Sequence, residues 1–183
     1  MTAFRTSETA PTQEVRPKCD WTTTTVDAAR GKPPIDIAVA WFGTWDVIDA
    51  KVPELGDAWV SVDDANYRLW LIEEMLAFNQ LLVNVTGARA VVWLTLFPNP
   101  RSTHPDRVDV YNDLLLTLSQ LDPAVRVVDI AGWIDSTGEA ARLLPDSVHL
   151  TYGKDGGPNS AAEVADRFLT AEILEIFDAL PAG

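Results

Sequence analysis

The chain has 183 residues, of which 47% are hydrophobic and 22% charged, proportions typical of one folded domain with a sizeable core. Its 27 acidic residues outnumber its 14 basic ones, and the net charge of −13 repels nucleic acid and anionic lipid. The composition therefore excludes wholesale disorder and argues against a nucleic-acid partner.

We expect neither a membrane span nor a secretory signal in this sequence. The most apolar short run, residues 35–42, is far shorter than the roughly 20 residues that cross a bilayer, and residues 1–17 lack an apolar stretch. We therefore expect a cytoplasmic location for the chain as written. The single cysteine, Cys19, cannot form an internal disulfide, and no Cys/His cluster has the spacing of a zinc site. Neither a metal nor another cofactor is expected.

The N-terminal region differs in composition from the rest. Residues 1–32 are rich in threonine, proline and charge and lack helical or alternating apolar spacing, so most of them are predicted to be irregular. We assign residues 1–18 to an irregular lead-in and residues 19–183 to the domain. Residues 35–42 then form an apolar run bounded by prolines and Gly43, which is typical of a buried parallel strand.

A helix and a second strand follow. Over residues 63–85, apolar side chains recur at steps of four and three and share one helical face: Leu71, Met75, Phe78, Leu82 and Val85. Asp63 or Asp64 can cap the start of this helix, and Gly87 can end it in the left-handed conformation. Residues 88–95 predict a buried strand, so the order is that of a βαβ unit.

The alternation continues toward the C-terminus. Residues 97–104 contain prolines and an asparagine and are predicted to form a loop. An amphipathic helix is expected over residues 108–121 and a strand over residues 125–130. After a loop, Ser160 and Glu163 form a capping box ahead of a final amphipathic helix that reaches Phe177.

Strands alternating with helices predict an α/β three-layer sandwich with a parallel sheet, because each crossover helix must cover a face of the sheet. Only three strands are clear, whereas such domains usually have about five or more, with the first strand in the middle of the sheet. We therefore expect the sheet to be short of its first strand.

The segment from Pro145 to Thr151 carries the most informative chemistry. Asp146 lies three residues before His149, close enough to accept a hydrogen bond from one ring nitrogen and to select the tautomer of the imidazole. The other ring nitrogen is then free to take a proton from a nucleophile. The same spacing also occurs where a loop aspartate caps a turn beside a surface histidine.

The surroundings of this pair resemble a known family. PDSVHLTYG, in a loop before the final helix, resembles the last sequence block of the SGNH (GDSL) hydrolases, and residues 35–46 resemble that family's strand and Gly-x-Asn-Asp block. The chain is similar in particular to SGNH domains attached to membrane acyltransferases, in which a Cys and a Trp precede a Gly-x-Trp-Asp or Gly-x-Trp-Glu block. Cys19 and Trp21 fit that pattern, and the resemblance covers residues 19–178.

The resemblance implies a flavodoxin-like SGNH fold and an ester hydrolase or O-acyltransferase that acts on a small acylated substrate, a sugar ester among the candidates. It makes His149 the general base, Asp146 its orienting partner, and Gly43 the residue that permits the turn opening the site. Trp45 stands where the family has its oxyanion-binding asparagine, so its indole N–H can donate to the oxyanion or its ring can wall an acyl pocket. Within a larger membrane acyltransferase, the domain would be extracytoplasmic.

The nucleophile departs from the family pattern. The family's serine lies in a Gly-Asp-Ser block after the first strand, and no such block precedes Ile35. All serines of this chain lack that setting: Ser7, Ser61, Ser102, Ser119, Ser136, Ser147 and Ser160. We therefore expect the chain to match only the C-terminal portion of an SGNH domain, with the nucleophile unknown.

Other functions stay open. One alternative is a catalytically inactive SGNH-fold remnant or ligand-binding domain, which would show neither serine labelling nor ester turnover. Another is a flavodoxin-like module that binds a nucleotide or flavin, although no glycine-rich turn follows any predicted strand.

Overall fold

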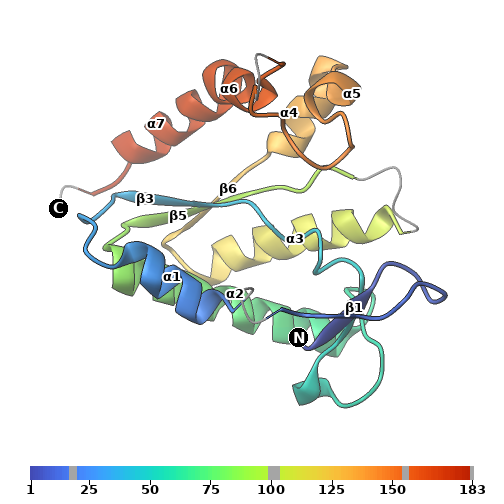
Figure 1. Cartoon of the computed structure of the whole chain (residues 1–183). Coiled ribbons are helices and arrows are strands. Elements are labelled where there is room, and N and C mark those ends of the chain that lie inside the picture. The colour runs from blue at the N-terminus through green and yellow to red at the C-terminus, as the bar shows by residue number, and fades with distance from the viewer. Residues whose placement is uncertain (17–19, 99–103, 154–156, 182–183) are drawn as a thin grey trace.

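The structure, a computed structural model, describes residues 1–16, 20–98, 104–153 and 157–181. It is mixed α/β, with one parallel and one small antiparallel sheet (Figure 1). The parallel sheet consists of β3 (Ile37–Ala40), β5 (Ala90–Leu94) and β6 (Val125–Val128), in that order. Each of its strands lies within a segment predicted to be a strand, so the α/β class and the parallel sheet are confirmed.

The central strand β5 is apolar throughout because both of its faces are covered. All five of its residues are buried. Val92 pairs with Val39 of β3, and Trp93 pairs with Val127 of β6, both in parallel register. A strand with no solvent-facing side has no position for a polar residue, so it reads as a continuous apolar run.

The crossover helix α2 (Ala65–Thr86) begins and ends where the sequence predicts. The side chain of Asp64 accepts from the backbone N–H groups of Asn66 and Tyr67, and Gly87 ends the helix with a φ of 74°. None of the helices in the described ranges is long and apolar enough to cross a membrane.

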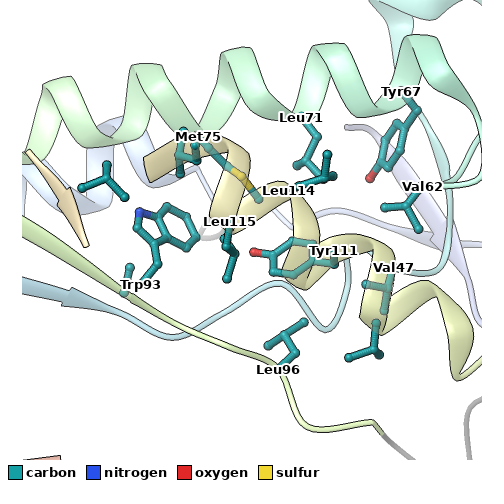
Figure 2. Close-up of a cluster of buried hydrophobic side chains, with 14 of the residues drawn as sticks. Val47, Val62, Tyr67, Leu71, Met75, Trp93, Leu96, Tyr111, Leu114 and Leu115 are labelled. Carbon is teal, nitrogen blue, oxygen red and sulfur yellow. The ribbon is translucent and has the colours of Figure 1, made fainter. Parts of the chain in front are cut away.

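The second crossover helix, α3 (Asp106–Leu121), packs with α2 on one face of the parallel sheet. Figure 2 shows the apolar cluster between them, with the Trp93 ring and the Tyr111 phenol pointing into it. The Trp93 indole N–H donates to Oδ1 of Asn79 over 2.8 Å, so this buried donor is satisfied inside the core.

Four helices and a π-helical turn lie on the other face of the sheet (Figure 1). They are α4 (Ile130–Thr137), α5 (Ala140–Leu143), α6 (Ser160–Val164), the turn η4 (Ala165–Leu169) and α7 (Thr170–Asp178). The segments α6, η4 and α7 lie where the sequence predicted a single helix. The helices α4 and α5 were not predicted. The predicted capping box is wrong: Asn159 caps α6 by accepting from the Ala162 N–H, whereas Ser160 is buried.

The N-terminal region is more ordered than its composition suggests. It contains β1 (Ala3–Arg5), β2 (Gln13–Glu14) and α1 (Trp21–Ala29), where most of residues 1–32 were predicted to be irregular. The irregular conformation is therefore wrong for these segments. Cys19 and the predicted boundary after residue 18 lie outside the described residues.

The order at the N-terminus comes from distant partners. β1 pairs antiparallel with β4 (Asp49–Lys51), which is followed by a 3₁₀ turn, η2 (Pro53–Leu55). Arg5 Nε lies 3.0 Å from an Asp49 carboxylate oxygen, and buried Arg107 of α3 bonds both Asp49 and Asp63, at 3.0 and 2.7 Å. Local periodicity carries no trace of such long-range pairing, which is why the sequence did not predict it.

Candidate general-base site

The loop that carries the predicted Asp146 and His149 pair is tied at both ends by one buried hydroxyl. Ser160 Oγ donates to the carbonyl oxygen of Leu143 over 2.7 Å and accepts the backbone N–H of Thr151 over 2.8 Å. Leu143 is fully buried in the apolar cluster between the parallel sheet and the helices α4 to α7. The loop therefore starts and ends at fixed points.

Asp146 and His149 are in direct contact. Oδ2 of Asp146 lies 2.8 Å from the ring Nδ1 of His149. Oδ1 of Asp146 accepts the backbone N–H of His149 over 2.7 Å and that of Val148 over 3.0 Å. The contact that the spacing suggested is present, while the catalytic role of the two side chains stays a prediction.

These hydrogen bonds keep the carboxyl group of Asp146 ionised. The backbone N–H of His149, the ring of His149 and the backbone N–H of Val148 hold the pKa of Asp146 well below its ordinary value. An ionised carboxylate only accepts, so it selects the tautomer with the proton on Nδ1. Nε2 of His149 then presents a lone pair, as a general base must.

The site is open to solvent. The His149 side chain is 76% exposed and the Asp146 side chain 51%. Tyr152, three residues beyond His149, is also strongly exposed. It was not selected from the sequence, because an aromatic residue in a loop gives no signal of its own until its exposure beside the pair is known.

None of the described serines hydrogen-bonds to His149. Ser61 donates to a carboxylate, and Ser119, Ser136 and Ser160 donate to backbone carbonyls. Ser147 lies between the two residues of the pair with a φ of 68°, the only positive value among described residues other than glycine. Ser102 lies outside the described residues. The nucleophile is therefore not identified in the described part of the chain.

Gly43 lies in the turn that follows β3, as expected, but packing explains its identity. Its φ is 129°, and a Cβ at this position would collide with the Tyr111 ring. The Tyr111 hydroxyl donates to the carbonyl oxygen of Phe42 over 2.9 Å, which holds the ring against the turn. Only glycine permits both the conformation and this close approach.

Trp45 follows in the same turn and is 56% exposed. Its ring packs against Phe4 of β1, with 4.9 Å between ring centroids. This contact favours the packing role over the oxyanion-donor role. Within the described residues, neither Gly43 nor Trp45 has a hydrogen bond or ring contact to the Asp146 and His149 pair, so the structure brings together two of the four predicted site residues.

Asp46, the next residue of this turn, was not selected from the sequence. Its side chain is partly buried, and burial raises its pKa to about 7, although the N-terminal ammonium group opposes that rise. The hydroxyl of Tyr67 donates to the backbone carbonyl of Asp46 over 3.2 Å. Perturbed carboxyl groups concentrate at functional sites, so Asp46 joins the candidates. The available signal was the Gly-Thr-Trp-Asp sequence of residues 43–46, which ends in this carboxylate.

Comparison with known proteins identifies no family for the chain. No protein-family model matches the chain, and no curated protein sequence matches it.

Proposed function

We propose that the chain carries the general-base part of an SGNH-type ester hydrolase or O-acyltransferase. In this proposal, the fold is a flavodoxin-like α/β/α sandwich and the substrate is a small acylated molecule such as a sugar ester. The contact between Asp146 Oδ2 and His149 Nδ1 carries the proposal, because it leaves an accessible Nε2 as the acceptor. In this proposal the serine is missing from the 183-residue chain.

The chemistry follows from this arrangement. Nε2 of His149 removes the proton of a serine hydroxyl while the serine oxygen attacks the acyl carbonyl carbon, and Asp146 stabilises the resulting imidazolium. The imidazolium then protonates the departing alcohol as the acyl–oxygen bond breaks, leaving an acyl-enzyme. Water or an acceptor alcohol, deprotonated by the same Nε2, releases the acyl group.

Labelling of the protein made from its complete gene tests the proposal. A serine-directed fluorophosphonate should form an adduct, and mass spectrometry of the peptides should place it outside the described serines. His149→Ala should lower labelling and p-nitrophenyl acetate turnover by at least about 10³-fold, and Asp146→Asn should lower them too, because the ring loses its orienting carboxylate. Equal labelling of wild type and His149→Ala would contradict the proposal.

A non-catalytic ligand-binding domain is the second candidate. The observation in its favour is that no described hydroxyl contacts His149, whose side chain is largely exposed. This candidate predicts neither a fluorophosphonate adduct nor ester turnover in the same experiment, and no change on mutation of His149.

A further inference from the structure

A polar cavity of about 380 Å³ lies where the N-terminal sheet meets the starts of α2 and α3. Cavities that take small ligands measure about 300–1,000 Å³ and contain a few fixed polar groups. The polar walls of this cavity come from distant segments of the chain: Arg5 of β1, Glu8, Trp59, Asp63 and Asp64 ahead of α2, and Arg107 of α3. The cavity therefore has the size and the kind of lining of a ligand site.

The walls of this cavity hold one another in place. Arg5 and Arg107 bond different oxygens of Asp49, each over 3.0 Å, so the two guanidinium groups share one carboxylate. The Arg5 guanidinium also stands 4.3 Å from the centre of the Trp59 ring. Arg107, whose side chain is 9% exposed, bonds Asp63 over 2.7 Å. A ligand would find these groups already ordered, which lowers the entropy cost of binding.

Three donors around the cavity have no acceptor within the described residues. Arg5 and Arg107 donate from Nε and Nη1, so Nη2 of each is free, and the indole Nε1 of Trp59 is free as well. Among the described side chains, only Asn79 has a fully buried nitrogen or oxygen without a partner, so the three free donors reach solvent. Because Arg107 is otherwise buried and lines the cavity, its Nη2 opens into it.

Free acceptors line the same cavity. Arg107 and Ser61 both donate to Oδ2 of Asp63, which leaves Oδ1 without a partner in the described residues. Asp64 uses Oδ1 to cap α2, which leaves its Oδ2. The Glu8 side chain is exposed at the rim. Since a carboxylate only accepts and a guanidinium only donates, a ligand that uses the whole cavity must both donate and accept.

The charges of the lining decide the class of ligand. Four carboxylates stand against two guanidinium groups, and both guanidinium groups share Asp49, so an anion bound at either Nη2 would also be repelled at short range. A cation would leave the free donors without an acceptor. A hydroxyl group carries a donor and an acceptor on one neutral atom, so neighbouring hydroxyls can bond guanidinium and carboxylate groups together without a charge to desolvate.

We propose that this cavity binds a neutral polyhydroxylated ligand of the size of a pyranose. In the complex, hydroxyl oxygens of the ligand accept from Nη2 of Arg5, Nη2 of Arg107 and the Trp59 indole, and its hydroxyl groups donate to the free carboxylate oxygens. The inference is independent of the proposed function, because this cavity contains neither residue of the candidate general-base pair and binding is measured without ester turnover.

An NMR titration of the 183-residue chain tests the inference. The neutral probes are the methyl α-pyranosides of D-glucose, D-galactose and D-mannose. The matched anions are the corresponding uronic acid glycosides, which carry a carboxylate in place of one hydroxymethyl group, and glycine is the zwitterionic probe. We expect saturable binding of at least one neutral glycoside, with a Kd of about 10 mM or tighter and a shift of the Trp59 indole N–H. Its uronic acid counterpart should bind at least about fivefold more weakly.

Variants provide the second arm. Trp59→Leu removes one wall and one donor, identifies the Trp59 signal among those of seven tryptophans, and should weaken binding at least about tenfold. Glu8→Ala removes a carboxylate at the exposed rim and should weaken binding at least about fivefold. Its matched control is Glu14→Ala, at an exposed carboxylate of β2 outside the cavity, which should bind within about twofold of wild type. If Trp59→Leu does not fold, the Glu8 and Glu14 pair decides.

Three results would overturn the inference. The first is the absence of saturable binding by every neutral glycoside. The second is binding that leaves the Trp59 indole signal unmoved or that Glu8→Ala and Glu14→Ala weaken equally, which would place the ligand elsewhere. The third is tighter binding of a uronic acid glycoside or of glycine than of every neutral glycoside, which would make the ligand charged.

Discussion

Asp146 uses both carboxylate oxygens, one on the ring of His149 and the other on two backbone N–H groups within three residues. All of these partners are local, so the hydrogen bonds of the pair itself lie within the four-residue segment from Asp146 to His149. This explains why the spacing alone pointed to the contact. The largely exposed His149 side chain is compatible with a general base and with a surface histidine beside a capped turn.

Gly43 offers a test at the scale of one residue. Gly43→Ala should lower the free energy of unfolding by about 3 kcal/mol, because the methyl group would meet the Tyr111 ring at a φ of 129°. Gly138→Ala is the matched control: its φ is 67°, but a Cβ there meets no atom within 4 Å. Urea denaturation measures both, and equal losses would show that backbone strain alone makes glycine necessary at Gly43.

Asp46 predicts a pH dependence of stability. Its pKa is raised to about 7 in the folded protein, so between its unfolded pKa, about 4, and pH 7 the folded state binds more protons and stability falls as pH rises. Asp46→Asn should therefore be more stable than wild type at pH 8, by no more than about 4 kcal/mol, because partial exposure reduces the effect.

The gain from Asp46→Asn should vanish near pH 4, where the aspartate is protonated in the folded protein. Thermal melts at pH 4, 6 and 8 measure it, with Asp57→Asn at an exposed carboxylate as control. A gain that is independent of pH would show that the stabilisation does not come from the ionisation of Asp46.

At the scale of elements, the loop of the candidate site depends on where α6 begins. Asn159 caps α6, so the next residue, Ser160, is free to face inward and bond Leu143 and Thr151. The sequence pattern assigned the cap to Ser160 because Ser-x-x-Glu is a common cap. Burial decided that Ser160 bonds inward and that Asn159 is the cap, because a hydroxyl inside the protein must find partners there.

Ser160→Ala should lower the free energy of unfolding by about 1–3 kcal/mol, because it leaves the buried carbonyl of Leu143 and N–H of Thr151 without that partner. It should also increase hydrogen exchange at the Thr151 amide. Ser136→Ala is the control, because its exposed hydroxyl bonds only the Trp133 carbonyl and its loss should change stability by less than about 0.5 kcal/mol. Similar losses in the free energy of unfolding of both variants would contradict the prediction that the two bonds of Ser160 stabilise the loop.

At the scale of the whole molecule, two sheets are joined through one buried guanidinium. Arg107 of α3 is 7% exposed and bonds both Asp49 of β4 and Asp63 ahead of α2. Asp49 also pairs with Arg5 of β1. The N-terminal strands are thus held to the part of the molecule that contains the parallel sheet by charges from four separate segments.

Arg107→Met should lower the free energy of unfolding by about 3 kcal/mol, since it leaves the largely buried Asp49 carboxylate with fewer partners. Arg142→Met, in the exposed network with Glu139 and Glu163, is the control and should lower it by no more than about 1 kcal/mol. Chemical denaturation measures both. A small effect at Arg107 would mean that the N-terminal sheet is held mainly by apolar packing, in which Ala50 and Val52 share one buried cluster with Trp93 of β5.

The sequence by itself determined the parallel strands, the helix end at Gly87, a helix start at Asp63 or Asp64, and the contact between Asp146 and His149, because each depends on local periodicity or on residues within a few positions. Tertiary structure alone decided the pairing of β1 with β4, the inward turn of Ser160, the contact of Gly43 with Tyr111 and the raised pKa of Asp46. These features arise between segments far apart in the chain, where burial and close packing choose among local conformations that the sequence pattern allows equally.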